Sequence, residues 1–314
     1  MYCHDCVTMK AGMISYDPHQ WRSHFFDIKG SMVKEITGRV LVCVAWSAAV
    51  VWAYKNGWHI AVPSTLHSLV GVALGLLLVF RTNASYDRFW EGRKLWGGMV
   101  NETRNLVRLG KAHLAADPAL LSRLARWTAA FPYAAMNGLR GVPGLGAAER
   151  YLPLDRVEAA RESKHTGLLV SQELTHCLQE AYKKGEITDI VLQMLDQNIQ
   201  LLVDYLGGCE RIRKTPLPFA YVIHLRRALI VYCFTLPFAL VETYGWTTIL
   251  DVFLVAYIFF GIEEIGVEIE GPFGFDDNDL PLEQICATIQ QNVAAIAELQ
   301  LDPANLEPVD LGSL

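Results

Sequence analysis

Acidic side chains gather at two places where their types and spacing could do chemistry. Asp276, Asp277 and Asp279 stand close together after a Pro-Phe-Gly turn. Oxygen atoms are the ligands that hard cations prefer, although a solvated turn that caps the next helix has the same composition. Glu186 and Asp189 stand at the expected start of another helix, where acids also complement the helix dipole. The residue types alone leave a structural role open for both groups, and a role in ion binding comes only with the family resemblance given below.

Four further acids, Glu263, Glu264, Glu268 and Glu270, follow an apolar stretch together. Glu264 and Glu268 lie four residues apart on one helix face, where like charges repel unless they are paired. The natural partners are the arginines that flank the other apolar stretches: Arg81, Arg88, Arg93, Arg226 and Arg227. We therefore expect a structural ion network at the border between apolar and polar parts of the chain. Arg39 is the one charge in the first apolar stretch when that stretch is extended back to Ile36, and it can snorkel to the membrane surface.

Histidines and cysteines form no catalytic constellation. His67 and His224 are isolated, and the apolar stretches contain no H-x-x-x-H or E-x-x-H motif. Cys3 and Cys6 form a C-x-x-C motif with no second pair nearby, which fits half a zinc site or an N-terminal extension. The seven Cys are scattered and odd in number, so reduced thiols are expected. We therefore expect no enzyme and no required cofactor, with calcium left open.

The composition places these residues beside a membrane. Hydrophobic types make up 52% of the 314 residues, charged types 19%, and the net charge is −6, with a mean hydropathy of +0.22. This excludes a disordered chain and argues against a nucleic-acid binder, which needs a basic surface. Each apolar stretch is about long enough to cross a membrane. The stretches are residues 40–54, 62–80, 228–244 and 246–262, the last two forming a hairpin around Gly245.

Basic residues give the orientation. Lys and Arg cluster before the first and third stretches and after the second, whereas the two short turns between stretches hold only Lys55. The positive-inside rule then places both termini and the long middle region in the cytoplasm. The predicted divisions are an N-terminal cytosolic segment, two transmembrane helices, a cytosolic helical region, two more transmembrane helices and a C-terminal cytosolic segment. Their limits are residues 1–35, 36–80, 81–227, 228–267 and 268–314.

Helical periodicity dominates the middle region. It predicts helices at residues 86–111, continuing out of the second span, and at 119–136, 155–183 and 186–206. A Gly/Pro-rich loop is expected at 137–153, and a helix stop at Leu206-Gly207-Gly208. No stretch alternates as a strand, so the fold is predicted to be all-α: four transmembrane helices plus a cytosolic helical bundle. No internal repeat is visible, which argues against a secondary transporter.

Three segments together resemble the bestrophin family, specifically its bacterial branch. They are residues 80–96 (FRTNASYDRFWEGRKLW), 216–227 (PLPFAYVIHLRR) and 261–282 (GIEEIGVEIEGPFGFDDNDLPL). Their order and spacing match, and the resemblance covers roughly residues 21–299. It implies a homopentameric ion channel of the bacterial cell membrane, with a hydrophobic neck formed by the second span and a second, cytosolic constriction. Eukaryotic members are calcium-activated anion channels, whereas bacterial members are regarded as cation-permeable.

The resemblance assigns one face of the second span to the neck. That face carries, at i+4 spacing, Thr65, Leu69, Ala73 and Leu77. Five copies would make apolar rings that gate by dewetting. A register error of one residue would exchange it for the neighbouring face, which carries Leu66, Val70 and Leu74. His67, as an intramembrane ionisable residue, faces either the pore or a helix interface.

The resemblance also assigns the cytosolic constriction and the calcium ligands. Ile190 maps to the aperture, and Glu186 and Asp189 would add rings of carboxylates that favour cations. The expected function is passive conduction of small monovalent ions, with cations such as sodium favoured. The alternative is a chloride channel with calcium-sensitive gating, because Asp276 and Asp279 match side-chain ligand positions of calcium-gated relatives. Two departures from those relatives, Gly271 and Asn278, leave calcium binding open.

Overall fold

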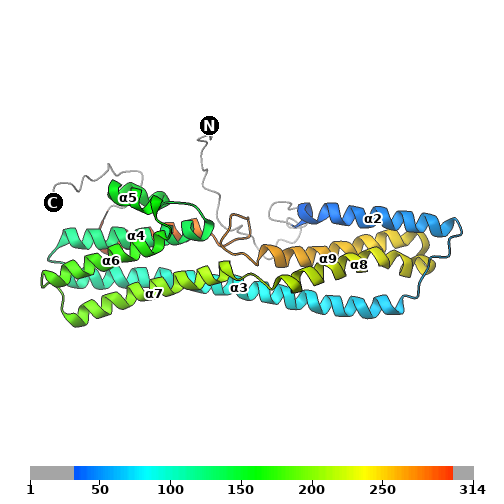
Figure 1. Cartoon of the computed structure of the whole chain (residues 1–314), viewed down its shortest axis with the longest axis horizontal. Helices are drawn as coiled ribbons and strands as arrows, with labels where there is room; N and C mark the ends of the chain where they lie inside the picture. Colours follow the sequence, from blue (N-terminus) through cyan, green and yellow to red (C-terminus); the bar gives the residue numbers. More distant parts are fainter. Residues whose placement is uncertain (1–31, 300–314) are drawn as a thin grey trace, which may run out of the picture.

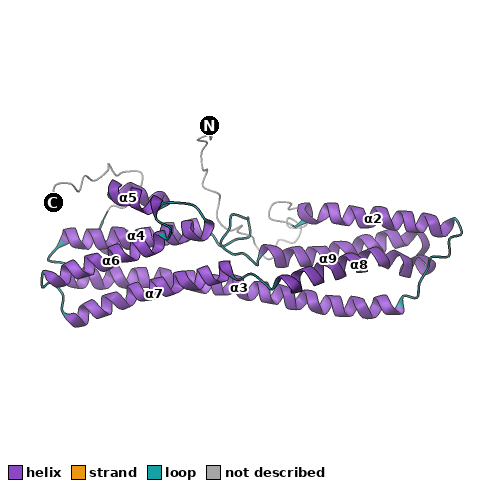
Figure 2. Ribbon diagram, viewed as in Figure 1, coloured by secondary structure: helices purple, strands orange, loops and turns teal. Residues whose placement is uncertain are grey.

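The computed structural model describes residues 32–299, and the described chain is helical with no strand (Figure 2). The helices are α2 (Val33–Lys55), α3 (Thr65–His113), α4 (Pro118–Arg140), α5 (Leu154–Glu162), α6 (Thr166–Lys183), α7 (Asp189–Lys214), α8 (Phe219–Tyr244), α9 (Thr248–Glu268) and α10 (Leu282–Ala297), with 3₁₀ turns η1 (Gly146–Tyr151) and η2 (Gly245–Thr247). The all-α prediction is confirmed over this range. The Cys3/Cys6 motif and most of the predicted N-terminal segment lie outside the described residues.

Two helical bundles lie end to end and share one helix (Figure 1). The first contains α2, α8, α9 and the first half of α3; the second contains α4, α6, α7, α10 and the rest of α3. The 49 residues of α3 span about 73 Å at 1.5 Å per residue. The predicted continuation of the second apolar span into a polar helix is confirmed. The predicted domain limits near residues 80 and 227 fall inside unbroken helices, so they mark a change of surroundings rather than a break in the fold.

The first bundle, called here the membrane bundle, holds every segment long and apolar enough to cross a membrane among the described residues. These are Val33–Lys55, Thr65–His113 and Phe219–Glu268. The third is a hairpin, because Gly245, with a φ of 55°, turns α8 back into the antiparallel α9. Only 33%, 17% and 22% of the three apolar windows are buried inside the subunit. The rest of this apolar surface needs lipid or other subunits to cover it.

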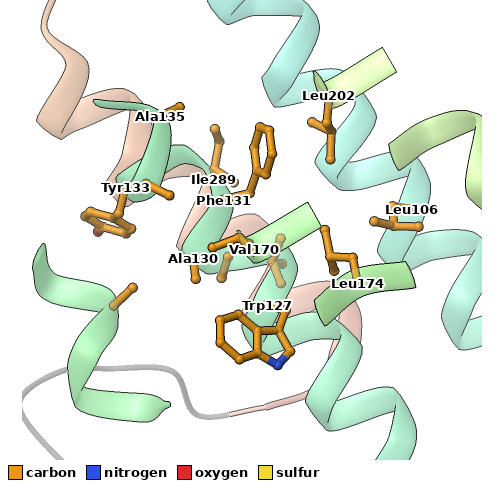
Figure 3. Close-up of a cluster of buried hydrophobic side chains, with 14 of the residues drawn as sticks. Leu106, Trp127, Ala130, Phe131, Tyr133, Ala135, Val170, Leu174, Leu202 and Ile289 are labelled. Atoms are coloured by element: carbon orange, nitrogen blue, oxygen red, sulfur yellow. The ribbon is translucent and has the colours of Figure 1, made fainter. Parts of the chain in front are cut away.

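The second bundle, called here the cytosolic bundle after the orientation predicted from the basic residues, has a large core of its own (Figure 3). Trp127 and Phe131 of α4 pack with Leu106 of α3, Leu174 of α6 and Ile289 of α10, and all five side chains are buried. A side-chain cap begins helix α4, and a glycine in the left-handed conformation ends it. The Asp117 carboxylate accepts from the Leu120 N–H at 2.9 Å at the start of α4, and Gly141, with a φ of 71°, ends it.

Three predicted boundaries in this bundle were wrong. Residues 155–183 form two helices, because His165 caps α6 through its own side chain and interrupts the run. The predicted loop at 137–153 contains the end of α4 and η1. Helix α7 passes through the predicted stop and ends at Lys214. Gly208 instead allows α7 to pack closely against Leu95 of α3, because a Cβ at this position would lie 2.9 Å from the Leu95 side chain.

Candidate ion pathway

The first half of α3 has one face inside the subunit and a broad apolar face outside it. The predicted neck face is exposed at Thr65, Leu69 and Ala73 and half-buried at Leu77. Leu69 keeps 67% of its surface exposed. Other apolar residues exposed on this half of the helix, which the sequence assigned to neither face, are Val72, Leu76, Val79 and Phe80. No sequence signal separates them from buried neighbours, because every residue in the run is apolar.

The alternative neck face is partly exposed and partly buried inside the subunit. Leu66 and Val70 are exposed, but Leu74 is only 3% exposed and packs with Leu78 into the core of the membrane bundle. The single subunit therefore presents the Leu69 face more evenly than the Leu66 face. Which of them lines a pore stays a prediction.

His67 is directed to α8 rather than along the exposed face. Its Nε2 lies 2.9 Å from Thr235 Oγ1, and the Thr235 hydroxyl donates to the Val231 carbonyl at 2.8 Å. The imidazole therefore donates from Nε2, and its ring lies 5.9 Å from that of Tyr232. Nearby, a Cβ on Gly71 would lie 2.7 Å from Tyr232 Oη. Within the subunit, His67 occupies a tightly packed helix interface.

The predicted cytosolic aperture lies at the start of α7, at the end of the molecule farthest from the membrane helices (Figure 1). Thr188 caps the helix, accepting from the Val191 N–H at 3.5 Å. Ile190 is 71% exposed, and Asp189 beside it is also exposed. A hydrogen bond from Tyr182 to the Asp189 carboxylate raises the pKa of Tyr182. Glu186 is half-buried, and its Oε2 has no partner among the described residues.

The aspartate turn does not bring its side chains to one point. Asp276 is exposed, whereas Asp279 is buried and accepts from the Asp276 N–H through Oδ2 at 2.8 Å. Burial raises the pKa of Asp279 to about 6, and its Oδ1 has no partner. No group of three or more His, Cys, Asp or Glu within residues 32–299 is arranged to hold a metal ion. Calcium binding at this turn stays a prediction.

Between the two bundles lies a buried ion network centred on Glu263. The Arg81 guanidinium, 1% exposed, contacts the Glu263 carboxylate, 2% exposed, at 2.7 Å. Arg226 contacts the same carboxylate oxygen at 2.8 Å. Arg39 reaches Glu264 at 2.6 Å and Glu263 at 3.4 Å. Four elements meet here, because the residues come from α2, α3, α8 and α9.

The predicted network is thus confirmed, with changes in membership. Arg39, which the sequence had not assigned to the network, pairs with two glutamates while its side chain stays 46% exposed, so snorkelling stays a prediction. Arg88 donates to backbone carbonyls of Ile212 and Glu270, at 2.6 and 3.1 Å, and so ties α3 to the end of α7. Arg93 and Arg227 form no ion pair with Glu263, Glu264, Glu268 or Glu270 in the described part of the chain. The Glu268 carboxylate instead accepts from Asn278.

Apolar helices joined by one long helix to a helical bundle define an α-helical membrane protein. The chain belongs to the bestrophin family: the model of the bacterial/fungal bestrophin proteins matches residues 13–295. A voltage-dependent anion channel-forming protein of Synechocystis is 40% identical over 91% of this chain and 94% of its own length. One of Nostoc is 40% identical over 93% and 95%. A crystal structure of a bestrophin homolog from Klebsiella pneumoniae matches with a TM-score of 0.80 and 31% identity, covering 84% of this chain and 99% of that one.

These matches confirm the family expected from the three motif segments. They do not support the preference for cations, because the names of the two relatives refer to anions.

Proposed function

We propose that this chain is the subunit of a homopentameric, passive ion channel in the bacterial cell membrane, with both termini in the cytoplasm. The observation that carries the proposal is the uncovered apolar face of α3. Only 17% of the apolar part of that helix is buried within the subunit. Five copies of α3 around an axis would cover the flanks of this face and leave its centre as the lining of a narrow neck.

The long helix fits such a pathway. Because α3 continues unbroken from the membrane bundle into the cytosolic bundle, five copies would surround a neck and then a wider vestibule. Ile190 stands exposed at the far end of the cytosolic bundle, where five side chains would narrow the exit. Leu69 and Ala73 would form apolar rings in the neck, which gate by dewetting and carry no charge.

Anion conduction is the first candidate for selectivity, and the names of the relatives support it. Conduction of cations such as sodium is the second candidate. It is favoured by one feature, the exposed Asp189 carboxylate beside Ile190, since a ring of carboxylates attracts cations. Apolar rings in the neck favour neither anions nor cations. The charge at the cytosolic aperture therefore decides between the two candidate selectivities.

The test is the reversal potential of purified protein in planar bilayers under a sodium chloride gradient. A reversal potential near the chloride equilibrium value supports the anion channel, and one near the sodium value supports the cation channel. In the second case Asp189→Asn should move the potential toward zero, with Asp196→Asn, farther along α7, as the matched control. Absence of conductance from assembled protein would contradict the channel itself.

A further inference from the structure

A cavity of about 600 Å³ opens in the membrane bundle between α2, α8 and α9. The α2 wall carries Arg39 and Val42, the α8 wall carries Arg226, Ile230 and Phe234, and α9 closes the back with Phe260. No residue of α3 lines it. Since α2 and α3 lie on opposite sides of the α8–α9 hairpin (Figure 1), the cavity is remote from the helix proposed to line the pore.

The lining changes from charged to apolar along the direction of both helices. On α8, Ile230 and Phe234 follow Arg226 by four and eight residues, about 6 and 12 Å along the axis. On α2, Val42 follows Arg39 by three residues, about 4.5 Å. Both arginines stand at the end that adjoins the cytosolic bundle. A matching ligand is an amphiphile with its polar end there and an apolar chain toward the membrane centre.

The polar end has spare hydrogen-bond donors. Arg39 contacts Glu263 and Glu264 through Nη1 alone, and Arg226 contacts Glu263 through Nε alone. The other guanidinium nitrogens of both residues have no partner within residues 32–299, and the two side chains remain 46% and 45% exposed. Glu263 is the one acid on the cavity wall, so the lining charges sum to a positive value. Guanidinium groups with free N–H donors suit a phosphate.

We propose that this cavity binds a phospholipid of the cytoplasmic leaflet. Arg39 and Arg226 hold its phosphate, and one acyl chain lies along Val42, Ile230 and Phe234. The inference rests on the membrane orientation given under the proposed function, which sets these arginines at the cytoplasmic headgroup level. A free phosphate would match the arginines and leave the apolar depth unused. The lipid joins α2 to α8 and completes a bundle that the protein alone leaves open.

The test compares two tryptophan substitutions at neighbouring positions of α8. Ile230, 50% exposed, lines the cavity, and Val231, 61% exposed, does not. Full-length protein is purified in mild detergent, titrated with dioleoyl phosphatidylglycerol and read by native mass spectrometry. The wild type and Val231→Trp should each retain one lipid per subunit, and Ile230→Trp at least fivefold less. Dioleoylglycerol, which lacks the phosphate, should bind the wild type at least fivefold more weakly.

A second pair on α2 applies if Ile230→Trp fails to assemble. Val42→Trp should lose the lipid, and Leu41→Trp, at a neighbouring exposed position outside the cavity, should keep it. Equal retention within both pairs would overturn the proposal, as would equal binding of dioleoylglycerol or saturation by inorganic phosphate alone. A cysteine introduced by Ile230→Cys that cross-links to a neighbouring subunit would also overturn the proposal, because the cavity would then face protein rather than lipid. Lipid retention by assembled but non-conducting protein would support the inference while removing the channel proposal.

Discussion

Helices α2 and α4 have the same length, 23 residues, and opposite relations to the subunit that contains them. Sixteen residues of α4 are buried, against six of α2. Helix α4 packs against neighbours on most of its surface, so its stability comes from hydrophobic burial within one chain. Helix α2 leaves most of its apolar surface outside, and polar contacts at its base, such as Arg39 with Glu264, fix its position. The cytosolic bundle buries its apolar core within one chain, whereas the membrane bundle leaves much of its apolar surface for lipid or other subunits to cover.

The largest effect should come from the base of the membrane bundle. Arg81→Gln leaves the buried Glu263 carboxylate without its shortest ion pair, and breaking such a pair costs about 3–5 kcal/mol. We expect the assembled protein to be lost at a much lower temperature, measured by size-exclusion chromatography after heating. Lys111→Gln is the control, because Lys111 pairs with Glu298 in an exposed position and should change little. Equal loss in both variants would remove the network from its structural role.

Substitutions of Leu74 and Leu69 in α3 distinguish a side chain that packs inside the subunit from one that is proposed to line the pore. Leu74→Ala removes a buried side chain and should cost about 2–5 kcal/mol of stability, with ion flux per assembled channel unchanged. Leu69→Ala removes an exposed side chain and should leave stability nearly unchanged while raising flux severalfold. Thermal stability and liposome flux are measured on the same preparations. The reverse result would indicate that the Leu74 face, rather than the Leu69 face, lines the neck.

The aspartate turn, residues 276–279, should contribute more to stability in acid than at neutral pH. The pKa of Asp279 is raised to about 6 from 3.8, so between these values the folded protein binds more protons than the unfolded chain. The contribution of Asp279 to stability is therefore fully present below about pH 4 and is lost as the pH rises through 6, by roughly 1–3 kcal/mol. Asp279→Asn should flatten this part of the pH profile of thermal unfolding. Asp276→Asn, at the exposed end of the turn, should leave it unchanged; a profile flattened equally by both would contradict the burial argument.

The smallest effect is expected at the far end of the cytosolic bundle. Ile190 is exposed and stabilises nothing in the single subunit, so Ile190→Ala should leave thermal stability unchanged. If five copies narrow the exit, flux should rise by a few fold in the liposome assay. Met194→Ala, one turn along the same exposed face of α7, gives a matched comparison. Unchanged flux in assembled Ile190→Ala protein would remove this ring from the pathway.

Much of this contrast could be predicted from the sequence. Uncharged runs identified the membrane helices, and periodicity carried α3 through residue 81 into the polar region. The ion network followed from the like charges of Glu264 and Glu268, which needed partners. The part that Arg39 takes in the network was missed, because its partner Glu264 lies 225 residues away and only tertiary packing brings them together.

Other features lay beyond sequence reasoning for physical reasons. Leu69 and Leu74 are the same residue type in one apolar helix, so nothing in their chemistry shows that one is exposed and the other buried. Gly208 had the signature of a helix stop, but contact with Leu95 gives it a packing role inside α7. The cavity between α2 and α8 depends on how three helices splay, which no single segment encodes.

Thiol accessibility tests the central claim, that the exposed face of α3 lines an ion pathway. The native cysteines within residues 32–299 are all buried, so wild-type protein serves as the background. Leu69→Cys and Leu74→Cys proteins are reconstituted in planar bilayers and treated with a charged, membrane-impermeant methanethiosulfonate. A pathway lined by the exposed face of α3 requires that current through Leu69→Cys is blocked, while current through Leu74→Cys and the wild type persists. Unaltered current through Leu69→Cys, with block at Leu74→Cys, would contradict it.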